Sequence, residues 1–309
     1  MTKSMKLLIW IFLLLPILSF GQENDYVRIG GTNLSLVPPQ GFEPSTNFKG
    51  FQMEDNPYAM IMVVEIPGPF SEIKKGFTKK AMAERGMELI KKENRALSSY
   101  EANYVEMEQE ANGVVFVKSI LIYGNETQTV IVNGMCLKEN QDLFPLIQDA
   151  ISTIKLDETL DVDPRSELAF TLNEELINLE FIGVVGNGML FNRDGNIPTE
   201  SEDQLNVFVD KSFATVNASD KEGFCLQRLS QYDDPYELDN DKGLEKVAID
   251  GIQGYSLFAK NELNKGETIR QIILFPEDGS YFIFHASYQE GYENTESDVD
   301  LFFKSFKVK

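Results

Sequence analysis

The chain has 309 residues and a formal net charge of −21 at pH 7, with 49 acidic residues against 28 basic ones. This length is enough for two domains of ordinary size. The acidity argues against nucleic acid and anionic lipid as partners, because both need a basic protein surface.

The first residues predict an export signal rather than part of the fold. Lys3 and Lys6 precede an apolar run over residues 7–18, and a small-x-small cleavage pattern ends at Gly21. The run is too short to span a bilayer comfortably. We therefore expect a signal peptide over residues 1–21 and a chain exported to the periplasm or the exterior, with no stable membrane insertion after cleavage. An uncleaved anchor is the alternative.

After this leader the pattern predicts strands and then one long helix. Residues 26–36, 50–54 and 58–67 favour strands, and prolines and glycines separate them. Residues 71–95 predict the clearest helix of the chain. Ser71 is a suitable N-cap for it, and apolar residues recur at roughly helical spacing.

This predicted helix is basic in an acidic protein. From Lys74 to Arg95 there are eight basic residues against three glutamates. One interpretation is a solvated helix face that balances the acidic second half. The other is a docking surface for an acidic partner or for the protein's own second domain. The candidate partner-binding residues are Lys74, Lys75, Lys79, Lys80 and Arg85.

The middle of the chain resembles its end. Residues 113–156 match residues 266–308, and the offset is 153 from Gly113 to Gly266 and 152 after the next turn. Both stretches predict two strands, a polar gap and a helix, so we expect an internal duplication. Asn112-Gly113 between two strand-like runs predicts a type I′ hairpin.

These patterns divide the chain into two α+β domains. We expect the first over residues 22–157, an acidic linker over 158–166 and the second over 167–309. Within the second domain, residues 168–172, 177–185, 189–192 and 224–232 favour strands, and residues 236–247 favour at most a short helix. The segment 202–216 fits a helix and a strand equally well. The element types over 196–222 are therefore left open.

The order of these elements is similar to a known family. A strand ends in Leu36-Val-Pro-Pro-Gln-Gly-Phe42, a meander with tight glycine turns follows later, and the chain closes in Ser305-Phe-Lys-Val. This order resembles the PsbP/DcrB-like fold, an antiparallel sheet sandwiched between helices. The resemblance covers the back of both halves best, and Thr153-Ile-Lys departs from Ser-Phe-Lys in the first half. It implies an accessory module that docks onto partners, with no shared active site.

Few residues suit catalysis or metal binding. The single histidine, His285, follows the apolar run Phe282-Ile-Phe, so we expect a strand residue with a satisfied ring rather than a catalytic base. It cannot complete a spaced zinc motif. Residues 192–196 and 239–243 look like calcium loops, but they lack the closing glutamate and favour turns. We expect no enzyme, no cofactor and no metal.

Two cysteines in an exported chain allow one disulfide at most. Cys136 and Cys225 are either two buried free thiols or a bridge between the domains. The sequence as a whole predicts an exported, non-catalytic interaction module that docks a protein partner. The alternative is a carrier that holds a small apolar or lipid-like ligand on a sheet face or between the domains.

Overall fold

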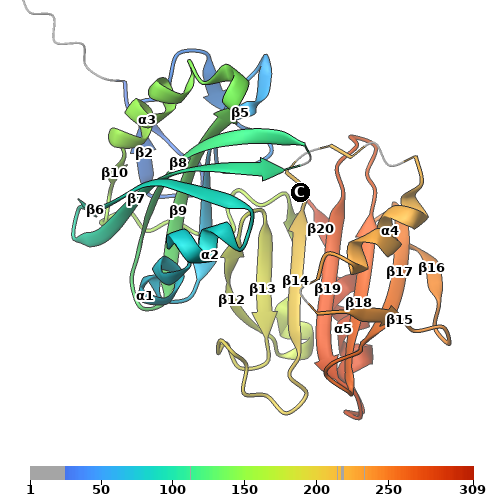
Figure 1. Ribbon diagram of the computed structural model, residues 1–309. Coiled ribbons are helices and arrows are strands. Elements are labelled where there is room, and N and C mark those ends of the chain that lie inside the picture. The colour runs from blue at the N-terminus through green and yellow to red at the C-terminus, as the bar shows by residue number, and fades with distance from the viewer. Residues whose placement is uncertain (1–24, 112, 214, 217–218, 233) are drawn as a thin grey trace, which may run out of the picture.

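A computed structural model describes residues 25–309 except 112, 214, 217–218 and 233. The predicted signal peptide and Asn112 of the predicted hairpin turn lie outside the described residues. Two lobes make up the described chain, each built around one large antiparallel sheet (Figure 1). All helices are short, and none in the described part is long and apolar enough to cross a membrane.

The first lobe holds a seven-stranded sheet. Its strands, in spatial order, are β3 (Phe42–Pro44), β4 (Gly50–Met53), β5 (Asn56–Pro67), β9 (Gln128–Leu137), β8 (Val114–Gly124), β7 (Tyr100–Ala111) and β6 (Met87–Leu97). A smaller sheet places β2 (Leu34–Leu36) between β1 (Val27–Arg28) and β10 (Lys155–Leu156).

Helices cover both faces of this sheet. On one face α3 (Phe144–Ser152) buries its apolar side in the main core of the lobe. On the other face lie α1 (Phe70–Ile73), the 3-10 helix η1 (Lys74–Gly76) and α2 (Lys79–Ala83). Phe70 and Met82 of these helices pack on β7 and β8 in a second, smaller core. A 3-10 turn, η2 (Lys138–Asn140), follows β9.

The second lobe repeats this arrangement. Its sheet contains β12 (Glu180–Val185), β13 (Gly188–Asn192), β14 (Asn206–Lys211), β19 (Phe282–Gln289), β18 (Glu267–Leu274), β17 (Ile252–Asn261), and the pair β15 (Tyr236–Leu238) and β16 (Leu244–Ile249) on the far side of β17. Helix α5 (Thr295–Lys304) covers one face and α4 (Lys221–Leu229) the other. The 3-10 turn η3 (Glu174–Ile177) packs beside α5, and β11 (Phe170–Thr171) pairs with the terminal β20 (Lys307–Val308).

The two large sheets follow the same order of strands. β5 pairs with β9 as β14 pairs with β19, and β2 pairs with β10 as β11 pairs with β20. Each lobe is thus an antiparallel sheet between helical layers, which confirms the predicted α+β fold class. All strands of the first sheets fall within 27–156 and those of the second within 170–308, and residues 157–169 connect them.

The prediction of one long helix over residues 71–95 is wrong. Three short helical segments end at Ala83, Gly86 adopts a positive φ of 70°, and the chain then runs as the edge strand β6. A left-handed residue after a helix is a common helix stop, and glycine adopts it without strain. The strand forms because Met87 and Leu89 pair with Gln109 and Met107 of β7.

Two predictions in the second lobe are also wrong. Residues 224–232 were expected to form a strand, but 224–229 belong to α4 and 230–232 follow its end. The first turn of α4 is capped by the Asp220 carboxylate, which accepts from the Gly223 N–H at 2.8 Å. Residues 236–247 were expected to be at most a short helix but supply β15 and part of β16, which both pair with β17. The open segment 202–216 contains the strand β14. At the predicted hairpin between β7 and β8, Gly113 has a positive φ of 78°.

The lobes contact each other along β5 and β12. Gly183 of β12 lies close to the ring of Pro67 on β5, since a Cβ added to this glycine would lie 2.8 Å from Cγ of Pro67. Nearby, Asn187 Nδ2 donates to the carbonyl of Asn47 at 2.5 Å, and the Phe48 and Phe213 rings meet edge to face at 6.4 Å.

Candidate functional site

The five candidate partner-binding residues lie on the helical layer of the first lobe. Lys74 and Lys75 belong to η1, Lys79 and Lys80 to α2, and Arg85 to the turn before β6. The structure therefore gathers them beside one another although the long helix predicted to carry them does not exist.

Three of these five cations are paired locally. Lys74 lies 3.0 Å from Glu101 of β7, Lys75 lies 2.7 Å from Glu72, and Lys80 lies 4.0 Å from Glu84. Lys79 and Arg85 make no ion pair with any residue that the structure describes. Exposed pairs of this kind contribute little to stability and exchange readily with an incoming partner.

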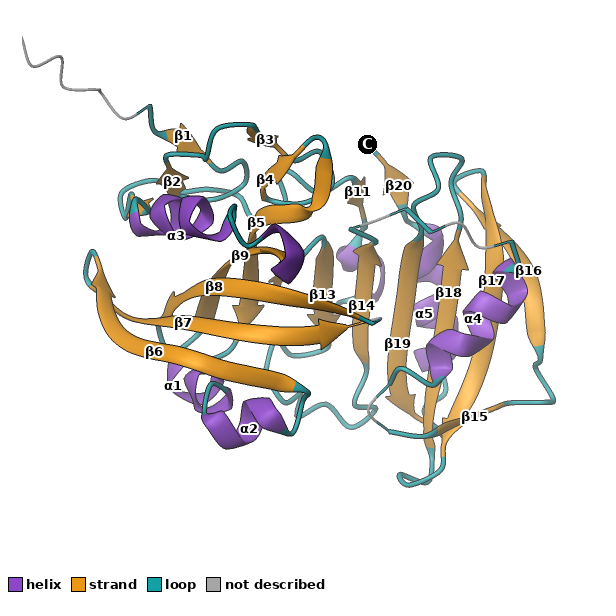
Figure 2. Ribbon diagram, turned by 45° about the horizontal axis from the view of Figure 1, so that its top comes forward, coloured by secondary structure: helices purple, strands orange, loops and turns teal. Residues whose placement is uncertain are grey.

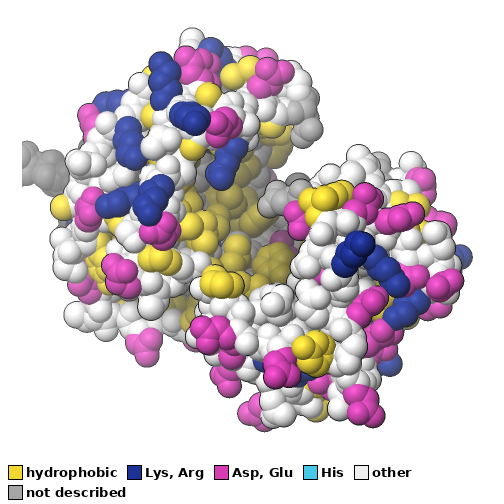
Figure 3. Space-filling view, turned by 60° about the horizontal axis from the view of Figure 1, so that its bottom comes forward, with side chains coloured by type: hydrophobic (Ala, Val, Ile, Leu, Met, Phe, Trp, Pro, Cys, Tyr) yellow, Lys and Arg dark blue, Asp and Glu magenta, His cyan; other side chains and the backbone are white. Residues whose placement is uncertain are grey.

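The neighbouring strand β6 adds more charge. Lys91 and Arg95 both contact Glu93, at 2.9 and 3.2 Å, and the hydrogen bond from Lys91 lowers the pKa of Glu93 from its ordinary value. Lys92 Nζ donates to the Phe77 carbonyl at 3.0 Å, which ties β6 to the helical layer. Figure 3 shows Lys and Arg side chains spread over this lobe beside a hollow lined by hydrophobic side chains.

A cavity of about 450 Å³ lies between the lobes. Its walls combine apolar side chains of the first lobe, among them Phe48 and Phe51, with Leu168 of the second. Charged and amide side chains share the lining: Arg28, Asn47, Lys49, Glu167, Asn187 and Lys211. Ligand sites commonly lie at such domain boundaries and have volumes in this range.

One cation of this cavity is already neutralised. Lys49 is buried and its ammonium lies 2.8 Å from Glu65 Oε2, 3.2 Å from the Gly31 carbonyl and 3.4 Å from the Pro164 carbonyl. These contacts hold β5, the Gly30–Gly31 turn and the segment between the lobes together. The role of Lys49 is therefore structural rather than that of a free cation for a ligand.

A cluster of titratable groups lies under α4, and sequence reasoning found only its histidine. His285 is on β19 and its ring packs on Tyr232 at a centroid distance of 4.8 Å. Burial lowers the pKa of His285 to about 4 and raises that of Asp210 on β14 to about 7. Gln271 accepts from the Tyr232 hydroxyl at 2.8 Å and donates to the Cys225 carbonyl at 2.9 Å.

The prediction of a satisfied histidine ring is wrong at one nitrogen. His285 is a strand residue as expected, but its Nδ1 is buried and has no hydrogen-bond partner among the described residues. The same holds for Asp210 Oδ1 and for Nε of Arg228 in α4. No sequence motif signals this cluster, because its members come from four elements, β14, α4, β18 and β19.

Both cysteines are buried free thiols in different cores. Cys136 packs under α3, and Cys225 lies on α4 and packs against the second sheet, so the predicted alternative of a bridge between the domains is not formed. Burial raises the pKa of Cys136 to about 11 and that of Cys225 to about 12, which keeps both protonated and unreactive. No metal-binding cluster occurs within the described residues.

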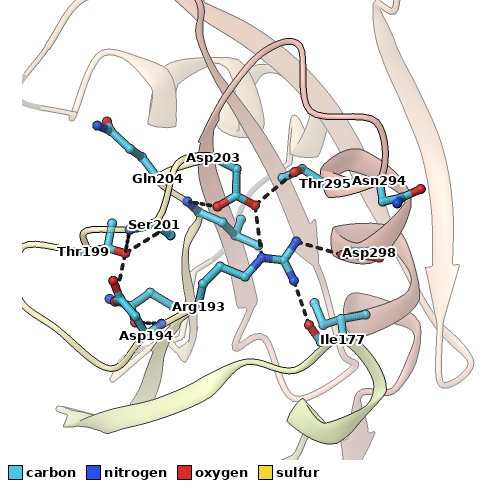
Figure 4. A network of polar contacts seen from close by, with 12 residues as sticks. Ile177, Arg193, Asp194, Thr199, Ser201, Asp203, Gln204, Asn294, Thr295 and Asp298 are labelled. Atoms are coloured by element: carbon cyan, nitrogen blue, oxygen red, sulfur yellow. Dashed lines mark hydrogen bonds and ion pairs between the residues drawn. The ribbon is translucent and has the colours of Figure 1, made fainter.

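The loop that looks like a calcium site is a hydrogen-bonded turn (Figure 4). Asp194 accepts from the backbone of Asn196 and Glu200 and from the Thr199 hydroxyl, at 2.7–3.1 Å. Its neighbour Arg193 lies 3.0 Å from Asp203 and 2.7 Å from Asp298.

This network is a structural tie. Arg193 also donates to the Ile177 carbonyl, and Thr295 donates to Asp203 at 3.0 Å. Burial opposes ionisation of Asp203, but the charge and hydrogen bond of Arg193, together with the hydrogen bonds from the Leu205 N–H and the Thr295 hydroxyl, hold the pKa of Asp203 below its ordinary value. The partners thus join β13, the 3-10 turn η3 and α5 without an open coordination position.

Comparisons with known proteins give distant structural matches alone. No protein-family model matches the chain, and no curated protein matches it. Cyanobacterial PsbP from Synechocystis aligns over 43% of this chain and 91% of its own, with 14% identity and a TM-score of 0.32. LpqN of Mycobacterium tuberculosis, involved in cell envelope biogenesis, aligns over 45% and 83%, with 12% identity and the same TM-score of 0.32.

A third match spans both lobes. The T6SS immunity protein TplEi from Pseudomonas aeruginosa aligns over 92% of this chain and 96% of its own, with 8% identity and a TM-score of 0.32. Because the TM-scores lie below 0.5, none of these alignments assigns a function to the chain.

Proposed function

We propose that this chain is an exported binding module that docks a protein partner through its basic segment, residues 74–95. The export half of the proposal rests on the N-terminal pattern of residues 1–21. The docking half rests on the charge of the basic segment, which carries eight basic residues and three glutamates on a chain of net charge −21.

The geometry of the basic segment supports this proposal. Local acids neutralise Lys74, Lys75 and Lys80, while Lys79 and Arg85 find no ion-pair partner among the described residues. Complementary charge mainly sets the encounter rate and the choice of partner, so the proposal predicts an acidic partner surface and binding that weakens with salt.

Charge reversal at Lys79 and Arg85 tests the proposal. The double variant Lys79→Glu/Arg85→Glu should capture the partner from the exported fraction of the host about 10-fold less well than wild type, since it places repulsive charge at the contact. The matched control is Lys246→Glu/Lys265→Glu, which makes the same change of net charge on the second lobe. Equal capture by both variants would refute docking through the basic segment.

A second candidate function is a carrier of a small ligand. The observation that favours it is the cavity of about 450 Å³ between the lobes, with Phe48, Phe51 and Leu168 in its wall. Native mass spectrometry of protein purified from its host distinguishes the two functions. A co-purifying small mass that is lost on Phe48→Trp would support the carrier, whereas a co-purifying protein supports the docking module.

We also propose that the chain has no catalytic activity. His285 packs beneath α4 with a pKa lowered to about 4, and both thiols are buried with raised pKa values. A general base works best with a pKa near the operating pH, so none of these groups is suited to that role at neutral pH. Hydrolysis that is lost on His285→Gln in the folded protein would contradict this proposal.

A further inference from the structure

The two large sheets have four edges, and they differ in how they are protected. An edge strand exposes unpaired N–H and C=O groups that invite another strand, so most proteins shorten, cover or interrupt such edges. The edges here are β3 and β6 in the first sheet and β12 and the β15–β16 pair in the second.

Three of these edges carry one of the usual protections. β3 has three residues and ends in Pro44, which has no N–H to donate. β12 is covered, because it packs against β5 of the first lobe. The last edge is divided between β15, with three residues, and β16, with six.

The fourth edge, β6, is long and open. It has 11 residues and lies at the outer margin of the first sheet (Figure 2). Its backbone pairs with β7, and within the described part of the chain no other backbone hydrogen bond involves residues 87–97. Helix α2 packs on Met87 and Leu89 from the sheet face, which leaves the edge itself free.

The side chains of β6 restrict what can pair with it. Lys91, Lys92 and Arg95 outnumber Glu88 and Glu93, and a bulge interrupts the register between Leu89 and Lys91. Bulges and lysines are protections against pairing with a like strand. If two copies paired antiparallel about the Lys91–Lys92 step, each Lys91 would face a Lys92, and directly opposed like charges destabilise a pair.

The same charges favour a strand of opposite sign. Lys79 and Arg85, two cations of the basic segment that make no ion pair with a described residue, lie on α2 and on the turn that leads into β6. Ile90 at the bulge is 56% exposed and offers an apolar contact beside the charged side chains. Backbone pairing would supply affinity, and the charges would supply selectivity.

We propose that β6 is a strand-addition site that takes an extended, acidic segment of a partner protein as an eighth strand of the first sheet. This inference rests on the proposed docking function and specifies its partner class and its mode. The occupant is an acidic extended peptide, recognised by its backbone and its negative charge.

Synthetic peptides test the mode on the full exported chain. The probe is an 11-residue peptide, the length of β6, that alternates glutamate with valine or threonine. Its control has the same sequence with N-methyl groups on every second residue, which removes backbone donors and keeps the charge. We expect the unmodified peptide to bind at least about 10-fold more tightly, because several backbone hydrogen bonds are lost in the control.

Hydrogen exchange locates the contact. Amides of β6 that exchange freely in the unbound protein should gain protection with the unmodified peptide. The variant Lys91→Glu/Lys92→Glu should lose that protection, and the control Lys246→Glu/Lys265→Glu should keep it. If the variant is poorly folded, protection of β8 and β9 in the unbound protein reveals it, and Lys92→Gln alone then serves as the milder change.

Three outcomes would overturn the inference. Equal binding of the two peptides means a contact by charge alone, which leaves the docking function standing without strand addition. No binding of the acidic peptide removes the proposed occupant. The third outcome is seen without peptide: the protection of β6 rises with protein concentration and the protein has twice its monomer mass. The occupant of β6 is then a second copy of the chain. Failure of the docking function itself is seen separately, as unchanged capture by Lys79→Glu/Arg85→Glu.

Discussion

The equivalent strand pairs of the two lobes carry different side chains on the face that α1 and α2 cover in one lobe and α4 covers in the other. In the first lobe β5 and β9 set Val64 against Ile131 and Met62 against Asn133. In the second lobe the equivalent strands β14 and β19 set Asp210 against Ile283 and Phe208 against His285. Val64 and Asn133, which cannot titrate, thus correspond to Asp210 and His285, which can.

The covering helices follow this difference. Over the first sheet, α1 and α2 bury apolar side chains, and the lysines of α2 are exposed. Over the second sheet, α4 brings Arg228 toward Asp210 and encloses a polar cluster. One strand order therefore tolerates both arrangements, and the helix that covers the sheet decides where charge is placed.

The largest expected effect compares the cores under α3 and α5. Phe302 is fully buried against Phe191, whereas the residue of α3 at the matching place in the repeat is Ala150. Phe302→Ala should lower the free energy of unfolding by about 4 kcal/mol through lost burial and a residual cavity. The reciprocal Ala150→Phe should cost about 2 kcal/mol through overpacking. Urea denaturation measures each loss, and hydrogen exchange on β9 and β19 assigns it to the first or the second lobe. Lost protection on β9 in Phe302→Ala, or on β19 in Ala150→Phe, would contradict the comparison.

A slightly smaller loss of stability is expected when the ion pair of Lys49 is broken. Among the described residues, the second lobe has no ion pair as buried as this one. Lys49→Met leaves Glu65 without its partner, and breaking a buried pair in this way costs about 3 kcal/mol. The double change Lys49→Met/Glu65→Leu should recover most of the loss. Thermal and urea unfolding measure both, and a double variant as unstable as the single one would contradict this account.

The pH dependence should divide the lobes more finely. The pKa of Asp210 is raised to about 7 in the native state. Between the ordinary carboxyl pKa and pH 7, the native state therefore keeps a proton on Asp210 that the unfolded state has released. Its contribution to stability therefore increases as the pH falls from 7 toward 4. His285, with a pKa lowered to about 4, acts oppositely: stability is lost as the pH falls from 6.5 toward 4.

These two trends offset each other in the wild type. Asp210→Asn should become less stable than wild type toward pH 4.5, by about 2 to 3 kcal/mol relative to its difference at pH 7, and His285→Gln should show the opposite change. Arg228, Tyr232 and Gln271 face the two groups and are retained in both variants. Urea midpoints at pH 7 and 4.5 measure the effect, and Asn133→Gln in the first lobe is the control that should follow the wild type. Parallel behaviour of the two variants would contradict the assignment.

The smallest effect concerns the caps of the covering helices. Asp220 accepts from the Gly223 N–H at 2.8 Å in α4, while Thr78 accepts from the Ala81 N–H at 3.3 Å in α2. Asp220→Ala should cost about 1 kcal/mol and Thr78→Ala about 0.5 kcal/mol. Denaturation midpoints rank the two, and a larger loss for Thr78→Ala would reverse the expected order.

Sequence patterns located the back of each lobe well and its front poorly. β8, β9 and α3, like β18, β19 and α5, alternate or repeat clearly between glycine turns, so their local pattern agrees with their packing. The helix prediction for residues 71–95 failed because the strand beyond Gly86 is fixed by pairing with β7. Such pairing is tertiary and leaves no local period.

The candidate site was predicted to a similar extent. Charge counting found the basic residues, and the fold does place them on one surface. It could not show that Glu101 of β7 neutralises Lys74, because 27 positions separate them. The cluster around Asp210 was missed for the same reason, and Asp220 ahead of α4 was the one local signal that the helix there could have been found.

The contacts of Lys49 have a mechanical consequence. Its ammonium reaches Glu65 on β5 and the carbonyl of Pro164 between the lobes, so swinging one half of the molecule against the other would stretch these bonds. These bonds and the contact between β5 and β12 restrict how far the two halves can move against each other. A binding partner then has to fit a fixed spacing, and its selection depends on shape matching rather than on closure around it.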